Sequence, residues 1–211
     1  MNSYVPFQQN KAWEKDISFN NSSSKPHYTS HILGRRFALT LTAYKYLDIG
    51  INVGSMSFVE LLIGDNRGNR IILSYTTWKI FIERRMNIER LLQSTVTSSL
   101  MIGDLELEKC HVNIVKLKSR DTCLYMKPLT VAFMFKLEHC IEHVYIGLCQ
   151  NIHDVNKKFN KFVTILRQSC ITDKCNAARI LYEIHDKTSL IECELLIYAL
   201  DNIVNDALHK K

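Results

Sequence analysis

Two stretches of the chain share an order of apolar, polar and turn residues, and an internal repeat constrains the architecture more than any local pattern does. Residues 58–63 align with residues 111–116 at a spacing of 53, and without a gap residues 70–73 align with residues 123–126. Helix-like segments follow both stretches at the same spacing. Few residues are identical, so two readings stay open. Either the chain holds two tandem units, or two strand–turn–strand–helix segments resemble each other by chance.

The composition is that of a soluble globular protein with a substantial core. The chain has 211 residues, of which 46% are hydrophobic, and its seven cysteines are scattered. No apolar run approaches the roughly 18 residues of a membrane-spanning helix. The first ten residues contain no basic region followed by an apolar stretch, so no signal peptide is evident. We therefore expect reduced thiols and a nuclear or cytoplasmic, intracellular location without a membrane.

The positive charge is concentrated towards the N-terminus. Of a net charge of +6, residues 1–36 contribute five Lys/Arg against two acids, and residues 37–98 contribute seven against five. The two remaining stretches, 99–150 and 151–211, are nearly neutral. Clustered cations favour a polyanionic partner such as nucleic acid, because binding releases counterions from the phosphates. Mildly basic proteins without such a partner are also common.

The first half of the chain reads as a tail followed by strands and one helix. Residues 1–34 are polar, basic and rich in Ser, which predicts a flexible tail. Near-alternation of apolar and polar residues then predicts four short strands, at 37–46, 48–54, 58–63 and 70–73. Ser74 is a suitable N-cap, and apolar residues at steps of three and four predict a helix of about five turns after it.

The second half repeats this order and then becomes helical. Strands are expected at 99–102, 105–109, 112–117 and 123–126, followed by a strongly apolar helix that begins at Pro128 and would be buried against its twin or a second subunit. Three further helices are expected at 159–166, 177–184 and 190–208. The predicted fold is therefore α+β: two tandem antiparallel β-meander (ββββα) units at 35–96 and 99–150 with helices packed on the sheets, plus a helical C-terminal region at 151–211.

Several of these residues resemble a known family. Phe-Val-Glu-Leu-Leu-Ile at 58–63, a Gly-rich basic loop, Arg-Ile-Ile-Leu-Ser at 70–74 and the early helical Trp78 resemble the transcriptional positive cofactor 4 domain. The tandem arrangement over residues 35–150 is similar to the Whirly proteins. The resemblance implies single-stranded DNA binding, and some members bind guide RNA or melted duplex. The second unit departs from the pattern, because Val131 replaces the tryptophan and the loop of this unit has no glycine. A groove in the second unit would then have a structural role alone.

A single strand is held by cations that contact phosphates and by aromatic rings on which bases stack. The candidate nucleic-acid-binding residues are Arg35, Arg36, Tyr44, Lys45, Tyr46, Arg67, Arg70, Lys116, Lys118 and Arg120. In a strand, Tyr44 and Tyr46 share one face and Lys45 takes the other. The competing interpretation makes both tyrosines core residues and leaves the lysine solvated. Trp78 is expected in the core.

No metal, cofactor or catalytic site is expected. Histidine and cysteine residues recur around Cys110, His139 and His143, but no Cys pair has the two-residue spacing typical of zinc sites. The sequence also lacks a phosphate-binding glycine loop and a nucleophile elbow.

These observations predict a non-enzymatic protein that binds single-stranded nucleic acid, with DNA as the expected ligand and the preference between DNA and RNA left open. Binding would be largely independent of sequence and would serve replication or transcription in a virus, a mobile element or a host. We expect a homo-oligomer, a dimer or a tetramer. The alternative is a structural or assembly protein, such as a virion or scaffold subunit. In that case five cations would scatter over several faces: Arg35, Arg36, Lys45, Arg67 and Arg70.

Overall fold

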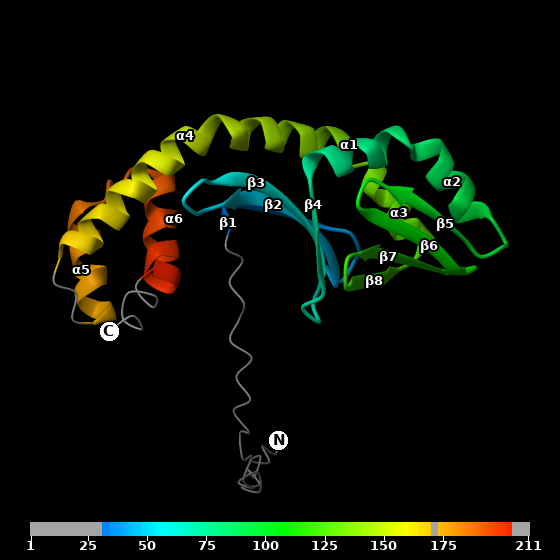
Figure 1. The fold of residues 1–211 in the computed structure, drawn as a ribbon, viewed down its shortest axis with the longest axis horizontal. Coiled ribbons are helices and arrows are strands. Elements are labelled where there is room, and N and C mark those ends of the chain that lie inside the picture. Colours follow the sequence, from blue (N-terminus) through cyan, green and yellow to red (C-terminus); the bar gives the residue numbers. More distant parts are fainter. Residues whose placement is uncertain (1–30, 170–172, 204–211) are drawn as a thin grey trace, which may run out of the picture.

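The computed structural model describes residues 31–169 and 173–203, and it confirms the α+β fold with two four-stranded antiparallel sheets (Figure 1). Both sheets are simple meanders in which neighbouring strands follow each other in the chain. Sheet 1 consists of β1 (His31–Ala38), β2 (Lys45–Asn52), β3 (Phe58–Asp65) and β4 (Arg70–Leu73). Sheet 2 consists of β5 (Ser98–Ile102), β6 (Leu105–His111), β7 (Ile114–Ser119) and β8 (Thr122–Met126).

Helices follow each sheet and connect the two ends of the molecule. Sheet 1 leads into α1 (Tyr75–Glu83) and α2 (Arg85–Gln93), and sheet 2 leads into α3 (Pro128–Phe135) and α4 (Glu138–Gln168). The 31 residues of α4, about 46 Å at the usual helical rise, run back over β2 and β3 of sheet 1 (Figure 1). None of the described helices is both long and apolar enough to cross a membrane.

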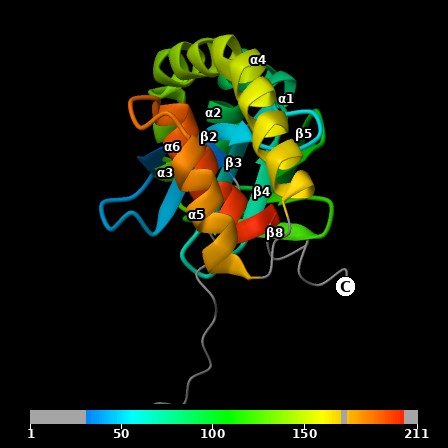
Figure 2. The same cartoon turned by 90° about the vertical axis from the view of Figure 1, so that its left-hand side faces the viewer.

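The chain ends in a helical group beside sheet 1. This group consists of α5 (Lys174–Ile184), α6 (Leu190–Tyr198) and a π-helical turn, Ala199–Ile203. Both helices pack against α4, and α6 also contacts β1 (Figure 2). Tyr198 donates a hydrogen bond of 2.9 Å to the carbonyl oxygen of Val53, which joins the helical group to the end of β2.

Alternation along the strands places one row of apolar side chains per sheet in the core. In sheet 1, Leu47 pairs with Ile63 and Ile49 pairs with Leu61, and all four side chains are fully buried. Residues directly opposite each other in neighbouring strands share a face, so these four form one surface. It is the surface that α4 covers.

One apolar core runs through both units. The rings of Trp78 and Phe81 on α1 stack at 5.8 Å between centroids, and Phe81 stacks on Phe135 of α3 at 4.9 Å. Trp78 is therefore a core residue, as expected from its place on the apolar stripe. The expected N-cap is also present, since the Ser74 side chain accepts a hydrogen bond from the backbone of Thr77.

The internal repeat holds for the second half of each unit. At the spacing of 53 residues, β4 and α1 superpose in sequence on β8 and α3, and the matched positions are buried in both: Ile71/Leu124, Leu73/Met126, Trp78/Val131 and Phe81/Met134. The ungapped alignment is wrong for the preceding strand. In the first hairpin the core residue Ile63 pairs with Ile71. In the second hairpin the equivalent core residue, Leu117, pairs with Leu124, so this hairpin is one residue shorter between its two core positions. A shift of one residue exchanges the two faces of a strand.

The first two predicted strands had the wrong boundaries. The described residues begin at His31. Strand β1 therefore includes residues that were assigned to the tail, and it ends at Ala38. A tight loop then reverses the chain, with the Leu39 N–H bonded to the carbonyl of Lys45 at 2.8 Å. Ala43 takes a left-handed backbone with φ of 52° in this loop. Because neither Gly nor Pro marks the turn, the alternating pattern continued across it and predicted one strand where two meet.

The helix boundaries also differ from those predicted. The expected five-turn helix is divided at Arg84, where α1 ends and α2 begins. Conversely, α4 is one helix through residue 150, where a boundary between the second unit and the C-terminal region was expected. The last predicted helix changes at Ala199 into the π-helical turn, and its remainder, 204–211, lies outside the described residues.

Replacing Phe81 with Ala should lower the free energy of unfolding by about 3–5 kcal/mol, because it removes a large, 1% exposed ring that joins α1 to α3. Urea denaturation of the two proteins measures this change. Leu129→Ala is the matched control, since Leu129 is 82% exposed on α3. A loss below about 1 kcal/mol for Phe81→Ala would contradict a core shared by the two units.

Candidate nucleic-acid interface

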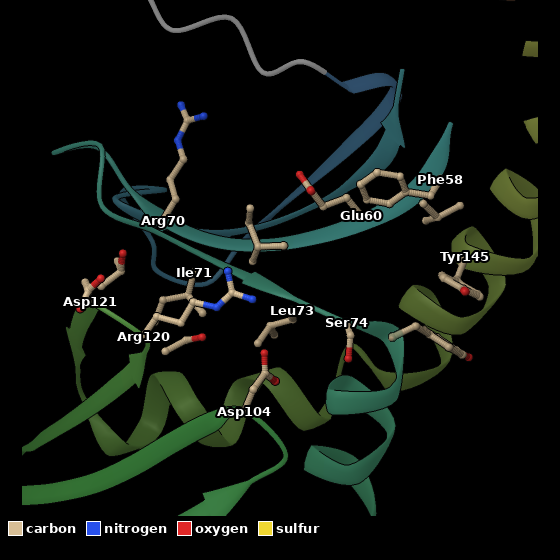
Figure 3. Close-up of a pocket in the computed structure, with 15 residues that line it drawn as sticks. Phe58, Glu60, Arg70, Ile71, Leu73, Ser74, Asp104, Arg120, Asp121 and Tyr145 are labelled. Atoms are coloured by element: carbon tan, nitrogen blue, oxygen red, sulfur yellow. The ribbon is translucent and has the colours of Figure 1, made fainter. Parts of the chain in front are cut away.

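A cleft of about 590 Å³ lies where the two units meet (Figure 3). Its walls come from edge strand β4 of sheet 1 and from the β7–β8 turn of sheet 2, and edge strands β4 and β8 run close to each other there. We call it the inter-sheet cleft. Its lining residues are Phe58, Val59, Glu60, Arg70, Ile71, Ile72, Leu73, Ser74, Tyr75, Asp104, Ser119, Arg120, Asp121, Thr122 and Tyr145.

Two of the predicted cations, one from each unit, line this cleft. Arg70 begins β4, and Arg120 occupies the turn between β7 and β8 with a left-handed backbone of φ 51°. In Figure 3 the guanidinium of Arg120 points into the cleft, whereas that of Arg70 points away from Arg120. Among the ion pairs and hydrogen bonds of the described residues, none involves Arg120.

The cleft also has apolar and aromatic walls. Phe58 at the start of β3 and Ile72 in β4 are both about half exposed, at 51% and 56%. The rings of Tyr75 on α1 and Tyr145 on α4 stack in parallel at 3.6 Å between centroids, with 5° between the planes. Burial and the neighbouring Cys149 side chain raise the pKa of Tyr145 above its ordinary value, so this phenol is neutral at physiological pH.

Three carboxylates balance the two arginines. Asp104 lies in the β5–β6 turn and accepts a hydrogen bond of 2.6 Å from Thr77 Oγ1 on α1. This turn needs Gly103, whose φ is 61° and whose Cβ, if present, would lie 3.1 Å from that same hydroxyl oxygen. Glu60 and Asp121 supply the other two carboxylates. The cleft is therefore polar with mixed charge, and it is not a uniformly cationic groove.

Arg35 and Arg36 are exposed neighbours on edge strand β1, and both line a hollow with Asp48 and Glu194. Arg36 Nη2 lies 2.7 Å from Asp48 Oδ2, and its guanidinium carbon lies 3.8 Å above the ring centre of Tyr46. The hydrogen bonds to Asp48 raise the pKa of Arg36 further above its already high ordinary value. Arg35 also lines a second hollow between β1, α4 and α6, together with His143 and Glu194.

The interleaved Tyr44, Lys45 and Tyr46 do not form an exposed binding surface. Lys45 is buried and its Nζ lies 2.9 Å from Asp65 Oδ2, so neither a phosphate contact nor a solvated lysine is present. Tyr46 is 3% exposed, and a Cβ at Gly64 would lie 2.7 Å from its ring. Tyr44 is half-buried beside Lys45.

Arg67 is exposed in the β3–β4 hairpin, which is organised by Asp65. The Asp65 carboxylate accepts hydrogen bonds from the backbone N–H groups of Arg67 and Asn69 at 3.0 and 3.1 Å. Burial raises the pKa of Asp65, but the bonds from Lys45 and Asn69 outweigh it, and the pKa is lower than usual. The carboxylate is therefore a structural anion of the hairpin, and Lys45 is its counterion.

Lys116 and Lys118 lie on the solvent face of sheet 2 opposite two glutamates. Lys116 Nζ is 3.0 Å from Glu108, and Lys118 Nζ is 3.8 Å from Glu106, both across the β6–β7 pair. The bond with Glu108 raises the pKa of Lys116. Alternating charges in two neighbouring antiparallel strands predict this pairing, so the sequence contained the signal. The face is close to neutral as a result.

Of the ten predicted residues, Arg70 and Arg120 come together in the inter-sheet cleft, and Arg35 and Arg36 come together in a smaller hollow beside β1 and β2. The residues that the sequence analysis missed are Phe58, Ile72, Tyr75, Asp104, Asp121 and Tyr145. Alternation in β4 places Ile72 opposite to the core face, which is a signal for exposure. No local pattern identifies Tyr145, because α4 brings it to the cleft from a distant part of the chain.

A buried polar group connects the cleft to β1. His31 Nε2 lies 2.7 Å from Glu60 Oε2, and Asn52 donates to the other carboxylate oxygen at 3.3 Å. The hydrogen bond with His31 lowers the pKa of Glu60, against the opposing effect of burial. Glu60 therefore stays ionised at the edge of the cleft over the neutral pH range.

Neither a metal site within the described residues nor a related protein helps to identify what the cleft binds. Within 31–169 and 173–203 no group of three or more His, Cys, Asp and Glu side chains could hold a metal ion. Comparison with family models, curated proteins and solved structures gives no match. The likeness to positive cofactor 4 and Whirly proteins stays a prediction from sequence pattern.

Replacing His31 with Ala should raise the pKa of Glu60, because it removes the main hydrogen bond to the ionised carboxylate and leaves burial unopposed. Since the folded pKa is below the ordinary value of 4.5, the ionised group stabilises the fold above that pH and loses this effect as the pH falls through the folded pKa. Carboxyl-detected NMR titration measures the shift. The exposed His139→Ala is the control, and an unchanged Glu60 pKa in the His31 variant would refute the assignment.

Proposed function

We propose that this protein binds single-stranded nucleic acid, DNA or RNA, and that the strand contacts it at the inter-sheet cleft. The observation that supports the proposal best is the lining of the cleft. Arg70 and Arg120 come from the two units, and half-exposed Phe58 and Ile72 lie in the same cavity. Cations that contact phosphates next to apolar rings that stack on bases are what single-strand binding requires.

The balance of charge favours a particular arrangement of the strand. Since three carboxylates line the cleft, phosphates are favoured at its rim and bases in its interior. Exposed Tyr125 on β8 and Lys127, which precedes α3, extend the basic and aromatic surface beyond the cleft on the sheet 2 side. A duplex cannot present unstacked bases to such a cavity without melting, so single strands should bind more tightly than duplex.

The test is fluorescence anisotropy with labelled oligo(dT), the matching RNA and a duplex over a series of salt concentrations. Phe58→Ala should weaken binding of the single strands about fivefold or more, through loss of one stacking platform. Arg70→Ala should weaken binding and reduce the slope of log K against log salt by about one, as expected for the loss of a single phosphate contact at the rim of the cleft.

Arg90→Ala is the matched control for Arg70→Ala. Arg90 is an exposed arginine on α2, which does not line the cleft, and the substitution makes the same change in net charge. Equal losses in both variants would assign the effect to overall charge and contradict binding at the cleft. No binding of any oligonucleotide at low salt would refute the proposed function.

The second candidate is a structural or assembly protein, and one observation favours it. The five cations that separate the two readings lie in different environments: Arg35 in the β1–α4–α6 hollow, Arg36 on Asp48, Lys45 on Asp65, Arg67 in a hairpin and Arg70 in the cleft. Exposed apolar side chains such as Leu129 on α3 and Ile146 on α4 would then contact a second copy or another subunit. Failure to bind nucleic acid, together with self-association, would support this candidate.

A further inference from the structure

The inter-sheet cleft combines hydrogen-bond donors and acceptors that do not satisfy each other. Figure 3 shows the side chains of Arg120 and Asp104 pointing toward the same space, with Leu73 beside them. No ion pair within 4.0 Å joins the two side chains among the described residues. One Asp104 oxygen accepts from Thr77, and no hydrogen bond of the described residues involves the other.

The net charge of this cavity argues against a phosphate in its interior. Two arginines are opposed by three carboxylates, and Glu60 is held in its ionised form by His31. A neutral ligand with both donor and acceptor edges suits such a lining better than an anion does, because Asp104 and Arg120 are exposed side chains of opposite charge that can each pair with one edge of it. The apolar walls and a volume of about 590 Å³ are those of a small-molecule pocket.

Among the bases of a single strand, guanine fits this pair of groups best. Its O6 and N7 atoms accept two hydrogen bonds from an arginine, which is the commonest base-specific contact of that side chain. Its N1–H and 2-amino groups donate in parallel toward one carboxylate on the other side of the base. Adenine and thymine do not offer this combination, and cytosine offers a carboxylate only its 4-amino donor.

We propose that the inter-sheet cleft is a guanine pocket, in which Arg120 donates to O6 and N7 and Asp104 accepts from N1–H and the 2-amino group. The inference rests on the proposed single-strand binding and replaces sequence-independent binding at this one position. Leu73 lies beside these two polar groups, whereas Tyr145 lies at the far end of the cleft (Figure 3). The positions of both polar groups are fixed by turns, Arg120 by its left-handed backbone and Asp104 by Gly103 and Thr77.

The experiment compares oligo(dT) with the same oligomer carrying one central guanine, adenine, cytosine or hypoxanthine. The guanine oligomer should bind about fivefold to a hundredfold more tightly than oligo(dT), the range expected for a bidentate base contact. Hypoxanthine keeps O6, N7 and N1–H and lacks only the 2-amino group, so the part of this preference that comes from the second hydrogen bond to Asp104 should be lost with it. This comparison uses the unaltered protein and does not depend on the folding of a variant.

The variant Asp104→Asn tests whether the Asp104 carboxylate recognises the base. Its amide oxygen can still accept the hydrogen bond from Thr77, while the negative charge is lost. The ratio of guanine to thymine affinity should fall to near one, whereas Glu183→Gln, an exposed carboxylate on α5, should leave that ratio unchanged. If oligo(dT) binds and guanine gives no advantage, the pocket is refuted and single-strand binding stands. A preference for cytosine would also refute it, and no binding of any oligomer would refute both proposals.

Discussion

The packing of α1 against α3 sets the geometry on which the rest of the molecule depends. The stack of Trp78, Phe81 and Phe135 joins the helix that follows sheet 1 to the helix that follows sheet 2. Around it, Lys79 pairs with Glu142 at 3.2 Å, and Thr77 donates to Asp104 at 2.6 Å. Because these contacts fix one unit on the other, they also fix the separation of edge strands β4 and β8. The inter-sheet cleft is therefore a property of the pair of units, and neither sheet forms it alone.

Burial of charge explains why most predicted contacts with nucleic acid are occupied by the protein itself. A charged group inside a fold needs a partner, since desolvation is costly without one. Lys45 pairs with Asp65 in the β3–β4 hairpin, and Arg36 pairs with Asp48 between β1 and β2 of sheet 1. The conflict between the two functional readings follows from the same fact, because four of the eight predicted cations, Arg36, Lys45, Lys116 and Lys118, form ion pairs with carboxylates of the protein.

The sequence was sufficient for the order of the elements but not for register. Apolar periodicity predicted two meanders and the equivalence of Trp78 with Val131, since both positions face one core. It missed the loop around Ala43, where a residue other than glycine takes a left-handed backbone. The site was less predictable, because Arg120 and Asp104 lie in two hairpin turns of sheet 2 and Tyr145 reaches their cleft only through α4, which runs back over sheet 1. Cross-strand partners such as Glu108 for Lys116 depend on the same register.

The most direct test of binding at the cleft is photo-crosslinking of an oligonucleotide that carries 5-iodouracil, followed by mass spectrometry of the crosslinked peptides. The account predicts crosslinks at aromatic residues in and beside the cleft, Phe58, Tyr75, Tyr125 and Tyr145, and their loss when unlabelled single strand competes. Crosslinks confined to the β3–β4 hairpin around Arg67 or to α5 and α6 would contradict it. Complete absence of crosslinks under binding conditions would favour an assembly protein.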